Sequence, residues 1–391
     1  MRIVRRLILC MCAAGILSAG AAVLYFTTTH SPRVIERDAT TYWAPARLLI
    51  HGENPFNAQR VQELQHEAGI RSSKPYFMYN PPWALTFLLP LGFLSDRNAI
   101  FLWELLSACF LLISTRLLWQ LHGKQPNRLH LLAYMFAPVV ACFAMGQIVP
   151  LMLLGFLLFL RWHRRYPLAA GLALSLLALK PHLAIPFGVV LLAQAGKQQE
   201  RRLLFGAIAG VVGASCIPFC LDRNIFSDYV PAFRAASAVS YTMPDLSSLL
   251  QMADPKGHAL LYLPALCGSL WALWWYRRNA ATWRWDRDGA FLLAVSVFVA
   301  PHRWLMDEAL MLPAVLACVY RSESSRAALT VFGVLNCAAL ALEFSDVQVT
   351  SWAYAWTSAA WLAWCVWVSI RQRSFASEGA PELAGAPGTL F

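Results

Sequence analysis

The sequence predicts an all-α polytopic membrane protein that crosses a bilayer about twelve times. Apolar residues make up 58% of the 391 residues, and charged residues only 14%, whereas a soluble chain carries about 25%. The aromatic residues, among them 16 Trp, suit the two interfaces of a bilayer. Because so few polar groups could not cover this much apolar surface, the composition excludes a soluble fold.

The net charge of +11 could indicate nucleic-acid binding or the enrichment of Lys and Arg in cytoplasmic loops. The basic residues lie in short clusters between the apolar runs, at 122–128, 161–165, 197–202, 277–287, 321–326 and 371–373. This placement favours the second interpretation, and we expect no nucleic-acid partner. The ten Cys lie within or at the ends of apolar runs, which argues against disulfides and metal sites.

The first predicted element is a signal anchor. Arg2, Arg5 and Arg6 precede an apolar run from Leu7 to Phe26, which is long enough to span a bilayer. The small residues at 13–15 come too early for the cleavage site of a signal peptide. The N-terminus is therefore expected in the cytoplasm, and residues 27–82 form a first outer loop that carries short helices.

The later apolar runs cover 98–120, 129–145, 147–161, 167–180, 182–195, 203–220, 259–276, 290–301, 304–320, 327–343 and 350–370. If 98–120 runs from outside to inside, every basic cluster faces the cytoplasm, and the opposite phase places nearly all of them outside. The positive-inside bias therefore favours the first threading. Residues 1–371 form one transmembrane domain, and the Gly-, Ala- and Pro-rich segment 372–391 is predicted to be a disordered cytoplasmic tail.

The apolar segment 82–94 does not fit this threading. As a helix of about 13 residues it would reach about 20 Å, against a hydrocarbon core of about 30 Å. We interpret it as a re-entrant or interfacial piece on the outer side. The alternative is a true span, with some other segment failing to cross.

The unusual polar residues collect in the turns that this threading places outside, at Gly146-Gln147, Lys180-Pro181-His182, 221–258, Pro301-His302-Arg303 and 343–346. A lysine at membrane depth is costly and usually lines a polar site, although Lys180 could also snorkel from a helix end. Asp307 and Glu308 follow in an apolar run, where Asp307 could simply pair with Arg303. Asp38 in the first loop could be only a helix N-cap.

Several fragments in the same order resemble glycosyltransferase family 87, a family of GT-C membrane mannosyltransferases. The first outer loop carries Asp38-x3-Tyr42-x3-Ala46 followed by Gly52-x2-Pro55-Phe56. The resemblance continues over about residues 30 to 320, through Tyr79-Asn80-Pro81-Pro82, Leu89-Pro90-Leu91, Trp103, Gly146-Gln147, Ala178-Leu179-Lys180-Pro181-His182, Met243-Pro244-Asp245 and Ala300-Pro301-His302-Arg303-Trp304…Asp307.

The resemblance implies a GT-C-type bundle in a bacterial inner membrane, with both termini cytoplasmic and the active site on the periplasmic side. It implies a hexosyltransferase that moves one sugar, commonly mannose, from a polyprenyl-phosphate donor to a lipid-linked or cell-envelope glycan acceptor. Asp38 stands at the position of the acidic residue that deprotonates the acceptor hydroxyl, in an inverting displacement.

The leaving polyprenyl phosphate gains negative charge, which fixed cationic groups would stabilise. The candidates for this donor-phosphate site are Lys180, His182, His302 and Arg303. Tyr42, Tyr79, Asn80, Gln147 and Asp307 are candidates for binding substrate. We expect no metal and no cofactor, because no carboxylate cluster has the pattern of a divalent-cation site.

Two rival functions share the membrane bundle. A transporter or flippase of lipid-linked sugars would usually show internal repeats, and the sequence shows none. A GT-C oligosaccharide ligase or polymerase tends to have large outer loops, whereas the longest predicted here are 27–82 and 221–258. Small substrates are therefore favoured.

Overall fold

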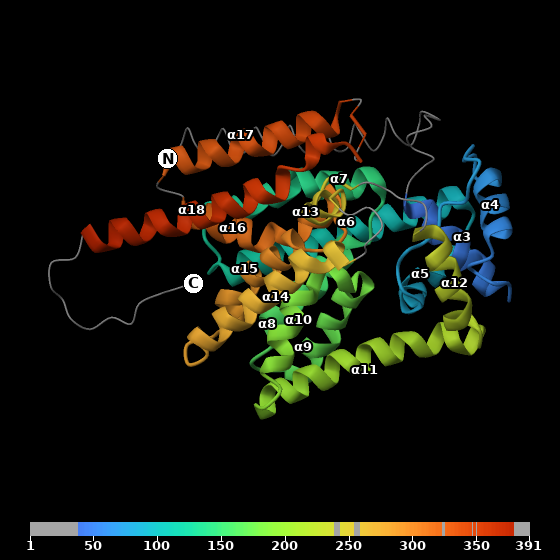
Figure 1. The fold of residues 1–391 in the computed structure, drawn as a ribbon, viewed down its shortest axis with the longest axis horizontal. Helices are drawn as coiled ribbons and strands as arrows, with labels where there is room; N and C mark the ends of the chain where they lie inside the picture. Colours follow the sequence, from blue (N-terminus) through green and yellow to red (C-terminus); the bar gives the residue numbers. More distant parts are fainter. Residues whose placement is uncertain are drawn as a thin grey trace. The chain divides into compact units, whose positions relative to one another are not determined.

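The computed structural model describes residues 38–237, 243–253, 259–322, 325–345, 347–348 and 350–378. All of the regular secondary structure in these ranges is helical. The predicted all-α fold class is therefore confirmed for this part of the chain (Figure 1). The predicted signal anchor, Leu7 to Phe26, lies outside the described residues.

The described residues form two compact units. Unit 1 takes its residues from Met1–Ser114, Val139–Pro181 and Gln194–Thr242, and unit 2 from Thr115–Pro138, His182–Ala193 and Met243–Phe391. Described segments of the chain alternate between these units, and the single transmembrane domain over residues 1–371 stays a prediction.

Unit 1 contains two short helices of the predicted first outer loop and most of the helices up to residue 237. In chain order they are α3 (Asp38–Ile50), α4 (Ala58–Glu67), η1 (Pro82–Ala84), α5 (Leu85–Gly92), most of α6 (Asp96–Leu121) and of α7 (Ala137–Met145), α8 (Val149–Trp162), α9 (Pro167–Leu174), η3 (Ser175–Leu179), α11 (Gln198–Leu221) and α12 (Ile225–Ser237).

The first-loop helix α3 packs against α5, the helix of the predicted re-entrant piece 82–94. Gly92 makes this packing possible, because a side chain there would lie 2.6 Å from the Ala46 carbonyl oxygen. Across the same contact the Trp43 indole donates to the Leu94 carbonyl at 3.0 Å. The Arg47 guanidinium donates to the Gly92 carbonyl, also at 3.0 Å. The segment 82–94 is therefore a short helical piece fastened to the first loop.

Helices α9 and α11 pack closely along their backbones in unit 1 (Figure 1). Side chains at Gly171 and Gly206 would collide with the Leu203 and Leu168 carbonyl oxygens, respectively. Gly210 lies one turn beyond Gly206 and faces Ser175. Small residues at four-residue spacing let membrane helices approach in this way.

Unit 2 contains η2 (Leu129–Met135), most of η4 (Pro181–Ala184), α10 (Ile185–Ala193), α13 (Leu246–Gln251), α14 (Ala259–Asn279), α15 (Trp285–Phe298), η5 (Leu305–Met311), α16 (Leu312–Arg321), α17 (Arg326–Glu343), η6 (Trp352–Tyr354) and α18 (Thr357–Glu378). Its core joins α10 to α15, where the Phe187 ring lies 5.0 Å from that of Trp285. In a second aromatic cluster, Phe136 and Phe332 pack against Trp361. Phe332 also packs against Trp364.

Three predicted apolar runs are each broken in two by a proline. Residues 129–145, 182–195 and 304–320 all form a 3₁₀ segment followed by an α-helix. The second residue of each of these α-helices is a proline, Pro138, Pro186 and Pro313. Since proline has no N–H to donate to the preceding turn, it fits a helix start and interrupts a continuous helix.

Four helices in the described part of the chain are long and apolar enough to cross a membrane by length and composition, namely α6, α11, α14 and α17. Other apolar runs form shorter helices, including α8 and the segments Pro167–Leu179 and Pro181–Ala193. The predicted count of about twelve spans and the sidedness of the turns stay predictions. Helix α18 continues to Glu378, so the chain is helical for some residues beyond the predicted start of the disordered tail at 372.

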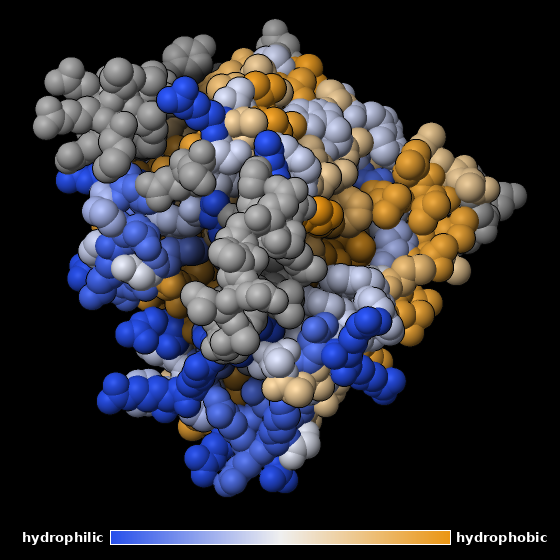
Figure 2. Space-filling view, turned by 90° about the vertical axis from the view of Figure 1, so that its left-hand side faces the viewer, coloured by the Kyte–Doolittle hydropathy of each residue, from blue (hydrophilic) through white to orange (hydrophobic). Residues whose placement is uncertain are grey.

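Large apolar side chains cover much of the molecular surface. Figure 2 shows broad apolar areas, in orange, beside polar ones. The exposed apolar residues include Phe101 and Leu112 of α6, Phe205 of α11, and Leu266 and Leu270 of α14. Exposed apolar area of this extent on long helices is typical of surfaces that face lipid.

Candidate functional site

The side-chain amide oxygen of Gln147 joins two predicted site residues in unit 1. The Lys180 ammonium donates to it at 2.9 Å. The Tyr42 hydroxyl donates to it through a longer hydrogen bond of 3.4 Å. Gln147 and Tyr42 are buried and Lys180 is half-buried. The structure thus places a cation, an amide and a phenol together.

The turn that presents Gln147 depends on Gly146. Its φ is +65°, a conformation that side-chain-bearing residues rarely adopt. A Cβ atom there would also lie 2.8 Å from the Ala39 Cβ. The Trp103 indole donates to the Gly146 carbonyl at 2.8 Å, and its ring packs edge-on against Tyr42. The first turn of α3, which begins at Asp38, therefore lies against the turn at Gly146.

Asp38 is half-buried and is the first residue of α3. Its backbone carbonyl accepts a hydrogen bond of 2.7 Å from the Thr41 hydroxyl. A carboxylate in the first turn is favoured by the positive end of the helix dipole. This placement at a helix start does not by itself decide between a capping role and a functional one.

Two side chains from η1 and the residues before it hold the backbone that leads to Lys180. The Asn80 amide donates to the Leu179 carbonyl at 2.9 Å. The Trp83 indole donates to the Ala178 carbonyl, also at 2.9 Å. Asn80 is thus a positioning residue for Lys180 in this geometry. The sequence did not single out Trp83, although its place directly after Pro81-Pro82 offered a signal.

Tyr79 lies at the surface of unit 1 beside α12. Its carbonyl accepts a hydrogen bond of 3.1 Å from the Tyr229 hydroxyl, and its ring packs edge-on against Phe233. Burial raises the pKa of Tyr229 to about 12, so this hydroxyl stays protonated at neutral pH. Asn54 of the first loop also donates to Asp228 of α12 at 2.8 Å. Hydrogen bonds and an aromatic contact therefore join the first loop and Tyr79 to α12.

Unit 2 holds a buried ion pair between Arg303 and Glu308. The Arg303 side chain is 3% exposed and that of Glu308 0%. The guanidinium also donates to the Pro244 carbonyl at 3.3 Å, and the Thr357 hydroxyl donates to Glu308 at 2.6 Å. A buried ion pair with these additional hydrogen bonds fixes the segment 302–308 against α18.

Asp245 connects the segment at Arg303 to α13. Its carboxylate caps α13 by accepting the Ser248 N–H at 2.7 Å and accepts the Arg303 N–H at 3.2 Å. Burial raises the pKa of Asp245, and these hydrogen bonds and the Arg303 charge partly offset that effect. Burial lowers the pKa of neighbouring His302, with a partial offset from Asp245. His302 is therefore expected to be neutral near pH 7.

Asp307 has a different role from the ion pair with Arg303 that sequence spacing allowed. Its carboxylate accepts the Trp304 N–H at 3.0 Å and so caps the start of η5. The partner of Arg303 is instead Glu308. Asp307 is 1% exposed, so substrate could reach its carboxylate only after local rearrangement.

The predicted residues therefore fall into one group in each unit. Asp38, Tyr42, Tyr79, Asn80, Gln147 and Lys180 belong to unit 1, and His182, His302, Arg303 and Asp307 belong to unit 2. His182 lies half-buried in η4, directly after Pro181. In the residues that the structure describes, no three His, Cys, Asp or Glu side chains lie close enough to hold a metal ion.

Comparison with known proteins identifies a family. The model of glycosyltransferase family 87 matches residues 77–342, which is more than half of the chain. The matched range includes Lys180, Gln147 and the segment at Arg303, whereas Asp38 and Tyr42 precede it. A search of curated proteins and a search of solved structures found no match.

Proposed function

Since the chain belongs to glycosyltransferase family 87, we propose that it moves one hexose from a polyprenyl-phosphate donor to a lipid-linked or cell-envelope glycan. The family indicates a glycosyltransferase, which uses a sugar donor and an acceptor. The proposal further specifies that the sugar is mannose and that transfer takes place on the periplasmic face of a bacterial inner membrane.

The observation that carries this proposal is the contact of Lys180 with Gln147 beside the first turn of α3. The Lys180 ammonium donates a hydrogen bond of 2.9 Å to the Gln147 side chain. The preceding residue, Gly146, lies against Ala39, which follows Asp38 in the chain. A transferase of this kind needs a carboxylate for the acceptor hydroxyl and a cation for the leaving phosphate. The arrangement supports both roles within unit 1.

In the proposed reaction the Asp38 carboxylate takes the proton of the acceptor hydroxyl as its oxygen attacks the anomeric carbon of the donor sugar. The bond between that carbon and the phosphate oxygen breaks, and the electron pair leaves with the polyprenyl phosphate. The new glycosidic bond forms on the opposite face of the sugar, which inverts the anomeric configuration. The anomeric carbon keeps its oxidation state, and the phosphate stays on the polyprenyl chain.

The other predicted residues have supporting roles in this proposal. Lys180 is assigned to the donor phosphate, and Gln147 and Tyr42 hold it in place. The sequence also suggests His182, His302 and Arg303 of unit 2 for the donor phosphate, and this assignment stays a prediction. Tyr79, Asn80 and Asp307 are assigned to substrate binding, Asn80 through its hold on the Lys180 backbone. An Arg303 that is already paired with Glu308 would act on phosphate only with its remaining N–H groups.

The direct test is incubation of the purified protein with polyprenyl-phosphate-mannose and a membrane lipid extract. Mass spectrometry should show acceptor lipids that are heavier by one hexose. The Asp38→Asn variant should not form this product. A sugar nucleotide carrying the same mannose serves as the control donor. Product from the sugar nucleotide but not from the polyprenyl phosphate would contradict the proposed donor.

The same experiment addresses the alternatives predicted from the sequence. A GT-C ligase or polymerase would add a preassembled oligosaccharide, so the acceptor would gain more than one hexose in one event. A transporter or flippase would produce no covalent product. Membership of a glycosyltransferase family argues against the transporter.

A further inference from the structure

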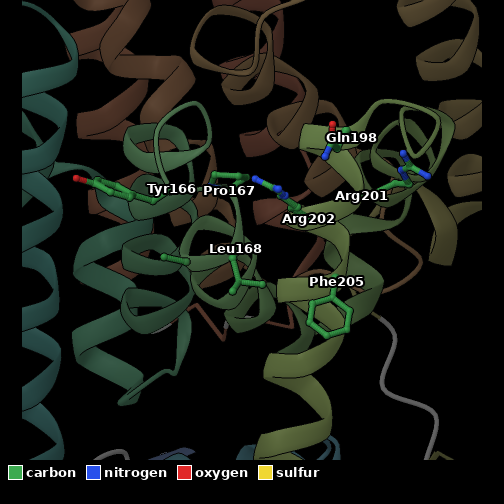
Figure 3. Close-up of a pocket in the computed structure, with 8 residues that line it drawn as sticks. Tyr166, Pro167, Leu168, Gln198, Arg201, Arg202 and Phe205 are labelled. Carbon is green, nitrogen blue, oxygen red and sulfur yellow. The ribbon is translucent and has the colours of Figure 1, made fainter.

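A broad cavity of about 750 Å³, largely open to the outside, lies on the surface of unit 1 where α9 and α11 begin (Figure 3). Residues from both helix starts line it, namely Tyr166, Pro167, Leu168, Ala169, Gln198, Arg201, Arg202 and Phe205. In Figure 3 the Arg202 side chain reaches toward Pro167 at the start of α9. None of these residues belongs to the proposed transfer site.

The polar edge of this cavity is strongly basic. Arg201 and Arg202 are exposed, and neither makes an ion pair with any residue that the structure describes. Arg165 and Lys197, in the turns just before α9 and α11, are also exposed. The one acidic residue in the first turn of α11, Glu200, is buried. The edge therefore carries an excess of positive charge.

An apolar surface begins at this basic edge and continues along both helices. Leu168 and Leu172 are exposed at four-residue spacing on α9, and Phe205 and Ile208 are exposed on α11. The Phe205 side chain, which lines the cavity, is the most exposed of the four at 65%. Residues at this spacing share one face of a helix. The cavity therefore has a cationic end and apolar walls.

The two helices that form the cavity pack closely against each other. Gly171 and Gly206 bring their backbones into contact, and the Gln199 amide donates to the His163 carbonyl at 2.9 Å, just before α9. A ligand would therefore meet preformed walls, which reduces the entropy lost on binding.

We propose that this cavity binds an anionic phospholipid. Its phosphate pairs with Arg201 and Arg202, and its acyl chains lie along Leu168, Leu172, Phe205 and Ile208. The charge of the edge fits a phosphate, for which guanidinium groups are the preferred partners. A free phosphate would use the edge alone and leave the apolar walls without a function. The basic cluster 197–202 is also predicted to be cytoplasmic, opposite the proposed transfer site.

Native mass spectrometry of the full chain in detergent tests the proposal. The probe is phosphatidylglycerol, with phosphatidylcholine as the zwitterionic control and inorganic phosphate as a competitor. The variant Arg201→Gln/Arg202→Gln removes both charges. The matched control is Arg277→Gln/Arg278→Gln, an exposed arginine pair at the end of α14. Arg201→Lys/Arg202→Lys keeps the charge.

The Arg201→Gln/Arg202→Gln variant is expected to bind phosphatidylglycerol roughly 10- to 30-fold more weakly, at about 1 kcal/mol for each basic residue. The α14 control and the Lys variant should keep most of the affinity. Equal losses in the two Gln variants would overturn the proposal in favour of generic surface charge. Displacement of the lipid by equimolar inorganic phosphate, or equal binding of phosphatidylcholine, would overturn it as well. Since both arginines are exposed, unchanged thermal unfolding serves as the check on folding.

Discussion

The Lys180 ammonium donates a hydrogen bond of 2.9 Å to the side-chain oxygen of Gln147. These residues lie in separate turns, one before α8 and one after η3. The same oxygen accepts the Tyr42 hydroxyl from α3. Gln147 therefore links three segments of unit 1, and its loss should release Lys180.

Replacing Gln147 with Leu should lower transfer by roughly 10- to 100-fold, because hydrogen bonds to charged groups contribute about 1.5 to 3 kcal/mol. The loss should appear mainly as a raised KM for the donor, since Lys180 is proposed to bind its phosphate. Tyr42→Phe is the control, because it removes only the longer bond of 3.4 Å. Equal effects of the two variants would argue against Gln147 as the residue that positions Lys180.

Replacing Asp38 with Asn should reduce kcat by roughly 10²- to 10⁴-fold, the usual contribution of a general base. Donor affinity should stay unchanged, because the amide keeps the shape of the carboxylate. Asp96→Asn is a matched control, since Asp96 is also half-buried in the first turn of a helix, α6. Transfer kinetics together with equilibrium binding of polyprenyl-phosphate-mannose separate the two effects. Full activity of Asp38→Asn would remove the base assignment.

The bounds of two long helices could be predicted closely from the apolar runs of the sequence. The predicted run 98–120 agrees with α6, Asp96–Leu121, and 327–343 agrees with α17, Arg326–Glu343. The run 304–320 was treated as one helix but changes from 3₁₀ to α just before Pro313. The overall hydrophobicity of the run does not reveal this break. An interior proline marks it here, but it does not break every helix, since α14 continues past Pro264.

The residues of the site could be named from the sequence more readily than their partners. Gln147, Lys180 and Asn80 were all candidates, but the contacts between them join segments far apart in the chain. Arg303 and Asp307 were compared at the spacing of an α-helix. The segment 305–311 is instead 3₁₀, with three residues per turn, and Arg303 precedes it. Helical spacing therefore did not apply.

Replacing Arg303 with Met should destabilise the fold by about 3 to 5 kcal/mol, because it leaves the Glu308 carboxylate buried without its partner. The double variant Arg303→Met/Glu308→Leu should recover most of that loss. Denaturation in detergent measures both. If Arg303 also contacts the donor phosphate, the double variant will fold but bind donor weakly. Wild-type donor affinity in the stable double variant would restrict Arg303 to a structural role.

The stability of the wild-type protein should fall as the pH drops below about 6.5, through His302. Burial lowers the pKa of this histidine from its ordinary value of 6.5, so between the two values the unfolded chain binds more protons than the folded one. Stability therefore rises with pH across that window and is full above it. His302→Gln should flatten the dependence, whereas replacement of the exposed His66 of α4 should not. Asp245 acts in the opposite direction, because burial raises its pKa above the ordinary value of 3.8 and the folded chain then binds more protons there than the unfolded one. Unfolding curves from pH 5 to 8 provide the measurement, and an unchanged slope in His302→Gln would contradict the assignment.

The contact between α9 and α11 should tolerate a methyl group at Gly213 but not at Gly206. A Cβ atom at Gly206 would collide with the Leu168 carbonyl oxygen, whereas one at Gly213, in the same helix, meets nothing within 4 Å. Gly206→Ala should therefore cost about 1 to 3 kcal/mol through overpacking against rigid backbone. Gly213→Ala should be neutral or stabilise by up to about 1 kcal/mol, because alanine favours helix more than glycine does. Both variants can be compared by thermal unfolding in the same detergent. If Gly206→Ala proves as stable as Gly213→Ala, then α9 and α11 do not pack through their backbones at this point, and the preformed walls of the proposed lipid cavity lose their main support.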